Sequence, residues 1–243
     1  MEGQATLRAS RGHLGSLRLD EIRSTPLLTL RAAAGAVYLV GGTATPLGGD
    51  NTALLLDVDH DATVQIRSVA AAVARPGPDT PESRFTVHAR LGPRATLRWE
   101  LEPGVAAARS AMVSEVYVDM AADARLWWRD ELMLGRCGEP SGRWSSYLHV
   151  DRGGRPLLRH HLSLGPTPAT SGPALVGDWR AVASLLVVGN APGGRTVRRP
   201  DGQAAALSLA GGDATLVSAM AVDHPALRSL LDATVVQPPQ LLP

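Results

Sequence analysis

The chain contains no lysine, because all 24 of its basic residues are arginines. This absence excludes mechanisms that depend on a lysine, such as Schiff-base catalysis and phosphate binding by a P-loop. Cys137 is the only cysteine, so no disulfide can form within the chain, and we expect a reducing, cytoplasmic environment. Phe85 is the only phenylalanine, whereas stacking platforms for single-stranded nucleic acid need more aromatic side chains.

Strong charge of one sign and long apolar runs are also missing. The net charge of +1 gives no electrostatic basis for nucleic-acid binding. No uncharged apolar run approaches the roughly 18 residues that would indicate a membrane span, and the scattered charges of residues 1–20 do not suggest a secretory signal. With 243 residues, of which 44% are hydrophobic, the chain is long enough to bury a sizeable core.

Most of the sequence consists of short apolar runs separated by glycine, proline and aspartate. Many of these runs alternate apolar and polar residues, which is typical of β strands. Turn signals recur roughly every ten to fifteen residues, a pattern that indicates a sandwich, a barrel or a β-solenoid. The predicted strands are Ala36–Val40, Thr52–Val58, Ala62–Val69, Arg84–Ala89, Ala95–Leu101, Val113–Met120, Arg125–Leu134, Ser145–Val150 and Arg155–Leu164.

The C-terminal part of the chain is predicted to contain a short helix at His224–Asp232. Asp223 precedes it as a capping residue, Pro225 lies near its start, and three leucines form one apolar face. The segment Trp179–Val188 fits either a helix or a buried strand. None of the loop-like segments is a convincing linker, so we expect a single domain over residues 1–243, in which residues 165–243 form a C-terminal extension.

The residues alone do not assemble an active site. The sequence has neither a Gly-x-Ser-x-Gly elbow nor a dinucleotide-binding glycine motif. The adjacent His160 and His161 would point to opposite faces of a strand and would not share one metal ion. Glu100 and Glu102 lie two residues apart on one face, as a carboxylate pair in a β-rich hydrolase would. A polar strand edge explains their spacing equally well.

Two glycine turns are each associated with an acid. Gly48 and Gly49 precede Asp50, and Gly135 lies between a strand that carries Asp130 and the segment Arg136–Glu139. A tight turn with positive φ explains such glycines, and the guanidinium of Arg136 suits a clamp on a carboxylate such as Glu139 or Asp130. These turns are therefore predicted to be structural.

Several segments resemble the UreD (or UreH) family of urease accessory proteins. The best-matched part is residues 36–164, and Arg125–Glu139 is the closest single match. In place of the longer polar stretch usual in that family, this chain has Val69–Ala74. The other matching segments are Leu47–Asp50, Thr63–Ser68, Leu97–Pro103 and Asp151–Leu157.

The resemblance implies an all-β fold, a right-handed superhelix of stacked strands (solenoid-like) with a minor C-terminal helix. It implies a protein with no enzymatic activity and no tightly bound cofactor. Such a protein binds a UreF-type partner, through it a UreG-type GTPase, and apo-urease. It conducts nickel in transit to the urease active site through an acid-lined tunnel.

The resemblance also implies roles for particular residues. Carried over by position, Asp50 and Asp130 are the first candidates for the nickel path, and Glu102 and Glu139 are the second. Gly48, Gly49, Gly135 and Arg136 would hold the turns that aim these acids. Oxygen ligands spaced along a path suit an ion that must be released. The apolar segment from Leu207 to Val236 is the predicted surface for the UreF-type partner.

Two alternatives to this assignment are left open by the sequence. One is a β-rich carbohydrate-type hydrolase that uses Glu100, Glu102 or Asp130, and it predicts two carboxylates facing each other across an open cleft. The other is an interaction module with no role in metal delivery.

Overall fold

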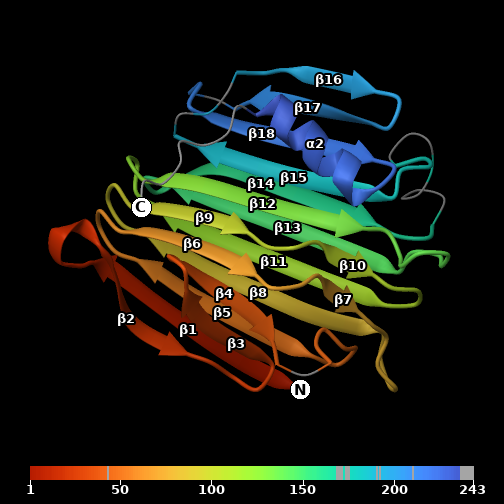
Figure 1. Cartoon of the computed structure of the whole chain (residues 1–243), viewed down its shortest axis with the longest axis horizontal. Helices are drawn as coiled ribbons and strands as arrows, with labels where there is room; N and C mark the ends of the chain where they lie inside the picture. Colours follow the sequence, from red (N-terminus) through yellow and green to blue (C-terminus); the bar gives the residue numbers. More distant parts are fainter. Residues whose placement is uncertain are drawn as a thin grey trace.

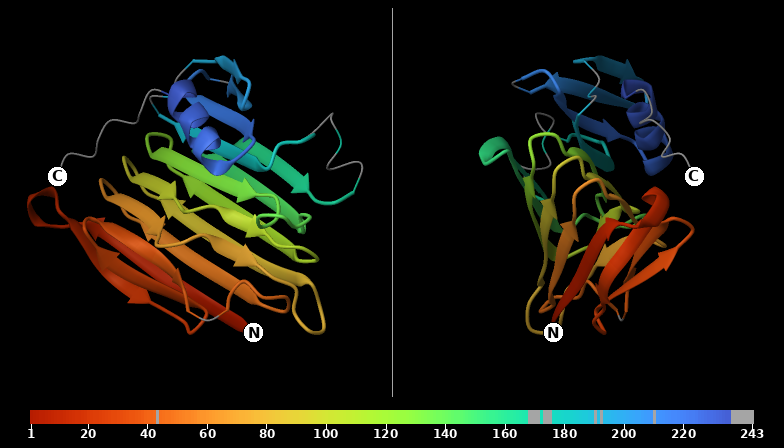
Figure 2. Two further views of the ribbon diagram at one scale, coloured as in Figure 1. Left: turned by 45° about the vertical axis from the view of Figure 1, so that its right-hand side comes forward. Right: turned by 90° about the vertical axis from the view of Figure 1, so that its left-hand side faces the viewer.

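The computed structural model describes residues 1–42, 44–167, 172, 176–189, 191, 193–209 and 211–235. Over most of its length the chain alternates between two β-sheets and forms the stacked coils of a β-solenoid (Figure 1). The coils follow one another from β1–β4 (red and orange) to β12–β14 (green), and the blue C-terminal strands and helix come last (Figure 2). The predicted fold class, a solenoid-like all-β structure with a minor C-terminal helix, is confirmed.

The first sheet has seven strands within the described residues. Five of them, β1, β5, β8, β11 and β13, are parallel neighbours, whereas β2 and β14 pair antiparallel at the two edges. In spatial order the strands are β14 (Arg155–Leu164), β13 (Arg143–Arg152), β11 (Ala111–Met120), β8 (Glu82–Leu91), β5 (Asn51–Val58), β1 (Glu2–Arg11) and β2 (Leu17–Arg23).

The second sheet has eleven strands within the described residues. Its middle part, β4–β6–β9–β12, is parallel, and the strands from β15 onwards are antiparallel. In spatial order the strands are β16 (Thr196–Arg199), β17 (Gly202–Ser208), β18 (Ala214–Ala221), β15 (Ala181–Val188), β12 (Arg125–Met133), β9 (Thr96–Glu100), β6 (Thr63–Ser68), β4 (Ala36–Gly41) and β3 (Leu28–Ala33). Two short strands lie off this path: β10 (Gly104–Ala106) pairs with β12, and β7 (Ala72–Ala74) pairs with β10.

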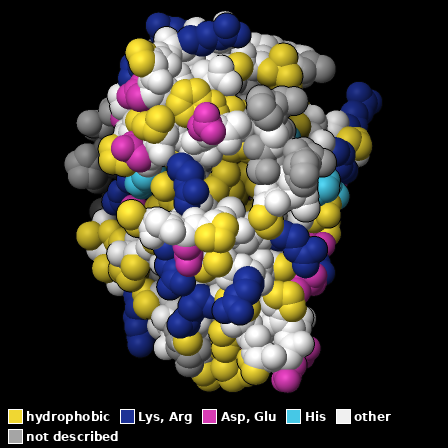
Figure 3. Space-filling model, turned by 90° about the vertical axis from the view of Figure 1, so that its right-hand side faces the viewer, with side chains coloured by type: hydrophobic (Ala, Val, Ile, Leu, Met, Phe, Trp, Pro, Cys, Tyr) yellow, Lys and Arg dark blue, Asp and Glu magenta, His cyan; other side chains and the backbone are white. Residues whose placement is uncertain are grey.

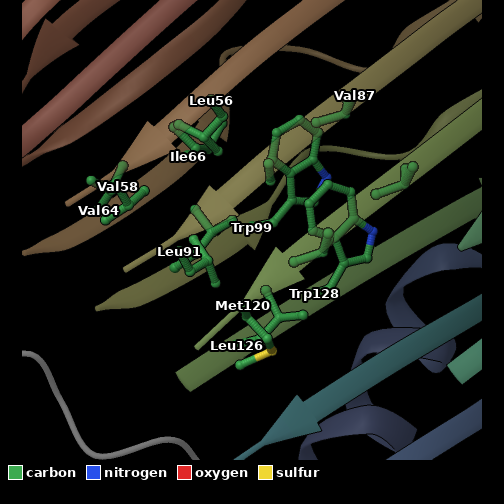
Figure 4. Close-up of a cluster of buried hydrophobic side chains, with 14 of the residues drawn as sticks. Leu56, Val58, Val64, Ile66, Val87, Leu91, Trp99, Met120, Leu126 and Trp128 are labelled. Carbon is green, nitrogen blue, oxygen red and sulfur yellow. The ribbon is translucent and has the colours of Figure 1, made fainter. Parts of the chain in front are cut away.

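The core lies between the two sheets and is built from equivalent positions of successive coils (Figure 4). In the first sheet, Leu54, Val87 and Val116 are in register and buried. In the second sheet, Trp99 and Trp128 are in register, and their rings stack with centroids 4.3 Å apart. Because inward positions recur every second residue, the alternation seen in the sequence becomes a continuous apolar stack.

Helix α2 (His224–Thr234) covers the outer face of the antiparallel end of the second sheet. Asp223 caps it by accepting a hydrogen bond from the Ala226 N–H at 2.9 Å, and Pro225 occupies its first turn. Leu227, Leu230 and Leu231 are buried against β15, β17 and β18. The helix is therefore fixed by one apolar face and a capped start, as the sequence predicted.

The predicted strands are all present, with ends that differ by a few residues. The ambiguous segment Trp179–Val188 forms the strand Ala181–Val188 and not a helix. The expected single domain over residues 1–243 remains a prediction. Among the described residues, no helix has the length and hydrophobicity needed to cross a membrane.

Candidate functional site

A cavity of about 370 Å³ lies between the sheets, near the C-terminal ends of β9 and β12. Trp99 and Trp128 form part of its wall, and Thr52, Ser114 and Ser184 add hydroxyl groups. Three acids, Glu102, Asp130 and Glu131, also line it. Figure 3 views the molecule from the end where these strands finish, and hydrophobic side chains surround a hollow near the middle of that face.

Asp130 is the acid on the inner face of β12. It follows Trp128 by two residues, so both side chains point into the space between the sheets. Burial raises the pKa of Asp130 to about 6; the hydrogen bond from Trp128 Nε1, at 2.9 Å, opposes this shift, and the charge of Glu131 adds to it. Among the described residues, an ionised Asp130 has no cationic partner, and it would be stabilised by one.

Glu131, the next residue, faces the opposite side of β12 and lies beneath helix α2. Its side chain has no exposed surface, and two guanidinium groups and one imidazole reach its carboxylate: Arg129 at 3.0 Å, Arg228 at 3.2 Å and His224 at 2.5 Å. This arrangement compensates the charge of a buried carboxylate, which would otherwise be costly. The sequence analysis missed this cluster, and only the tertiary fold brings its members together.

Glu102 lies just beyond the end of β9 and is partly exposed. Its backbone N–H donates to Ser68 Oγ at 2.9 Å, and its carboxylate accepts from Arg228 Nη2 at 3.3 Å. Arg228 thereby joins Glu102 to the buried Glu131. The structure brings Glu102 and Asp130 to the wall of the same cavity.

Glu100 and Glu102 have different surroundings. It is buried and accepts hydrogen bonds from Gln65 and Arg98, each at 2.8 Å. Burial acts to raise the pKa of Glu100, but the hydrogen bond and charge of Arg98 hold it below its usual value. Glu102 lines the cavity, whereas Glu100 is not part of its described lining. The two glutamates do not face each other across a cleft as the hydrolase alternative requires.

Asp50 belongs to a turn and not to the described lining of the cavity. It is buried, accepts a hydrogen bond from the Leu47 N–H at 3.0 Å, and pairs with the ammonium group of Met1 at 3.2 Å. Gly49 has a φ of +93°, and a Cβ on Gly48 would lie 1.9 Å from the carbonyl oxygen of Thr80. The turn needs glycine at both positions, and Asp50 holds it closed.

Glu139 belongs to a second turn. Arg136 clamps its carboxylate through two hydrogen bonds, of 2.8 and 2.9 Å. The hydrogen bonds from the Arg136 side chain and backbone lower the pKa of Glu139 to about 2. Gly135 has a φ of +80°, which starts the turn. Asp50 and Glu139 thus occupy two separate turns, apart from the cavity that Asp130 and Glu102 share.

No group of three or more histidine, cysteine, aspartate or glutamate side chains within the described residues has an arrangement that could hold a metal ion. The cavity acids are instead spaced along its wall and pair with arginine, histidine or an indole N–H. Among the described residues, the wall therefore presents separate carboxylates and not a convergent set of metal ligands.

Comparison with known proteins gives a consistent family assignment. The family model described as "UreD urease accessory protein" matches residues 1–241. A urease accessory protein UreD of Parafrankia sp. is 38% identical over 96% of this chain and 87% of its own length. Urease accessory proteins of the same type from Saccharopolyspora erythraea (36% identical, over 95% of this chain and 86% of its own) and Streptomyces griseus (38%, 90% and 85%) are similar.

Proposed function

This chain belongs to the UreD family of urease accessory proteins, and from that premise we propose that it is a scaffold that conducts nickel toward urease. Family membership places it in urease maturation. In the proposal, the chain has no catalytic activity of its own. It links a UreF-type partner, and through that partner a UreG-type GTPase, to apo-urease.

The nickel proposal depends mainly on the environment of the Asp130 carboxylate. Its carboxylate borders the cavity, is partly buried, and among the described residues has an indole N–H but no cation as its hydrogen-bond partner. A divalent ion that enters the cavity would relieve the cost of ionising this acid. One or two oxygen ligands, in contrast to a closed set of histidines and cysteines, would let the ion leave again.

The four acids divide into two roles in this proposal. Asp130 and Glu102, which share the cavity wall, contact the ion. Asp50 and Glu139 hold the turns that Gly48, Gly49 and Gly135 form near the strand ends. The nickel ion is cargo throughout, and no tightly bound cofactor is invoked.

The partner surface of this proposal lies in the C-terminal extension, residues 165–243. Its described part carries α2 on the second sheet, and Leu207 of β17 is 64% exposed. We place the UreF-type partner on this side, consistent with the surface expected from the sequence.

A reconstituted urease-activation assay tests the nickel proposal. Asp130→Asn keeps the shape of the side chain and removes its charge, so we expect complex formation to persist and urease activation to fall by at least tenfold. The matched control is Asp119→Asn, an exposed aspartate on β11. Activation that is unchanged in Asp130→Asn while the complex still forms would refute the proposed path.

A further inference from the structure

Arg228 is shared between two acids that differ sharply in exposure. Its Nε lies 3.2 Å from Glu131, whose side chain is fully buried, and its Nη2 lies 3.3 Å from Glu102, whose side chain is 38% exposed. The Glu131 end of the arrangement also includes Arg129 and His224. At the Glu102 end, Arg228 is the only cationic partner within the described residues.

The two ion pairs therefore differ in strength. A buried, multiply bonded pair resists disruption, because separation would leave an uncompensated charge beneath the helix. A partly exposed pair at 3.3 Å is screened by solvent and salt, and it contributes little. Arg228 can release Glu102 and remain held by Glu131.

Helix α2 keeps the guanidinium in place. Leu227, the residue before Arg228, is buried in the apolar contact with the second sheet, as are Leu230 and Leu231. His224 lies one turn earlier, four residues away on the same side of the helix, and it binds the same glutamate. The charge that faces Glu102 is thus positioned by a packed helix and not by a mobile side chain alone.

We propose that Arg228 is a displaceable counter-cation, which competes with a divalent cation for Glu102 and so keeps that cation weakly held. The proposal rests on the nickel path of the proposed function and assigns to it a residue that sets affinity. When a cation binds Glu102, it replaces the contact between Arg228 and that carboxylate. When Arg228 returns to Glu102, it displaces the cation. Arg228 is a positioning residue in this scheme and does not contact the ion.

Nickel binding to the purified full-length chain, measured with nickel alone by competition with a metallochromic indicator, tests the proposal. Arg228→Gln removes the competing charge, so we expect nickel to bind about two- to fivefold more tightly, a factor typical of an exposed ion pair. The charge-preserving Arg228→Lys should bind nickel nearly as weakly as the unmodified chain. In a Glu102→Gln background, Arg228→Gln should have no effect, because the shared ligand is gone.

A matched control separates competition from a loosened helix. Arg199 donates to Ser229 of the same helix at 2.8 Å and touches no cavity acid, so Arg199→Gln should leave nickel affinity unchanged. If Arg228→Gln destabilises the fold, Glu102→Asp offers a second route, because the shorter side chain withdraws the carboxylate from Arg228 and leaves the Glu131 pair intact. This variant should also bind nickel more tightly.

The outcomes distinguish this inference from the proposed function. Equal nickel affinity in Arg228→Gln, Glu102→Asp and the unmodified chain, including equal absence of binding, would overturn the role of Arg228. The same holds if Arg199→Gln has as large an effect as Arg228→Gln. In either case, a loss of activation in Asp130→Asn would still support the nickel path. Unchanged activation in Asp130→Asn would refute the path itself.

Discussion

Trp99 and Trp128 stack face to face on neighbouring strands, but only one of the two indoles has a hydrogen-bond partner in the described structure. Trp128 Nε1 donates to Asp130 at 2.9 Å, whereas Trp99 Nε1 is buried without an acceptor among the described residues. Both rings are almost fully buried, at 1% exposure. The pair therefore allows the hydrogen bond to be tested apart from the stacking.

We expect Trp128→Phe to destabilise the protein more than Trp99→Phe. Both changes reduce a stacked ring, but only the first leaves the Asp130 carboxylate without its donor. The additional cost should be about 1–3 kcal/mol, as for a hydrogen bond to a charged group. Urea unfolding of the two variants at pH 7 measures the difference. Equal losses would show that the hydrogen bond to Asp130 adds nothing to stability.

Asp130→Asn should stabilise the protein at neutral pH. The folded pKa of about 6 lies above the ordinary value of 3.8, so the ionised carboxylate destabilises the folded state. This penalty is absent below pH ~4, develops as the pH rises through 6, and reaches at most about 3 kcal/mol. The variant should therefore be the more stable protein at pH 7.

The measurement is the free energy of unfolding of both proteins between pH 4 and pH 8. The gap between them should close toward the acidic end of this range. A variant that is less stable than the unmodified chain at pH 7 would contradict the raised pKa. Together with the activation assay, this result would show whether Asp130 trades stability for function.

Gly48→Ala should disrupt the turn that Asp50 closes. The added Cβ would lie 1.9 Å from the Thr80 carbonyl oxygen and 2.3 Å from the Gly77 nitrogen, both backbone atoms that cannot rotate away. We expect a loss of about 3 kcal/mol or more, seen as a fall in the thermal midpoint of at least ~5 °C. Gly193→Ala, with no atom within 4 Å of the new Cβ, is the control. Equal midpoints for the two variants would contradict the close packing at Gly48.

Arg136→Gln should raise the pKa of Glu139 from about 2 toward its ordinary value of 4.5, because the guanidinium is the main cause of the depression. A depressed pKa contributes stability above pH ~4.5 that is lost as the pH falls toward 2. A carboxyl-selective NMR titration follows the change directly. Replacement of the exposed Arg31 on β3 should leave the titration of Glu139 unaltered, and an unmoved pKa in Arg136→Gln would rule out the clamp.

The strands that the sequence predicted are those with large alternating side chains. In β5, the inward positions Leu54, Leu56 and Val58 make the alternation obvious. In β1, the buried positions include Ala5 and Ala9, whose small side chains hide the same pattern. That strand is specified mainly by its parallel pairing with β5, a non-local interaction that alternation within one segment does not reveal.

The candidate site also has features that could be predicted from the sequence and features that could not. Asp130 could be selected because the segment that carries it, Arg125–Glu139, resembles the family. The partners of Glu131 could not be predicted, because His224 and Arg228 are 93 and 97 residues distant in the chain. The glycine turns were local and predictable, but their separation from the cavity depends on how successive coils stack.

The solenoid is bounded at both ends by antiparallel pairs. In the described structure, β2 and β14 form the edges of the first sheet, and β3 and β16 form the edges of the second; each is paired antiparallel to its only neighbour in the sheet. Parallel stacks with open edges invite other molecules to add strands and grow into fibres. Here β2, β3 and β14 run against the direction of the parallel stack, and β2 carries two arginines and two acids. Reversed and charged edge strands disfavour the addition of further parallel coils to the solenoid.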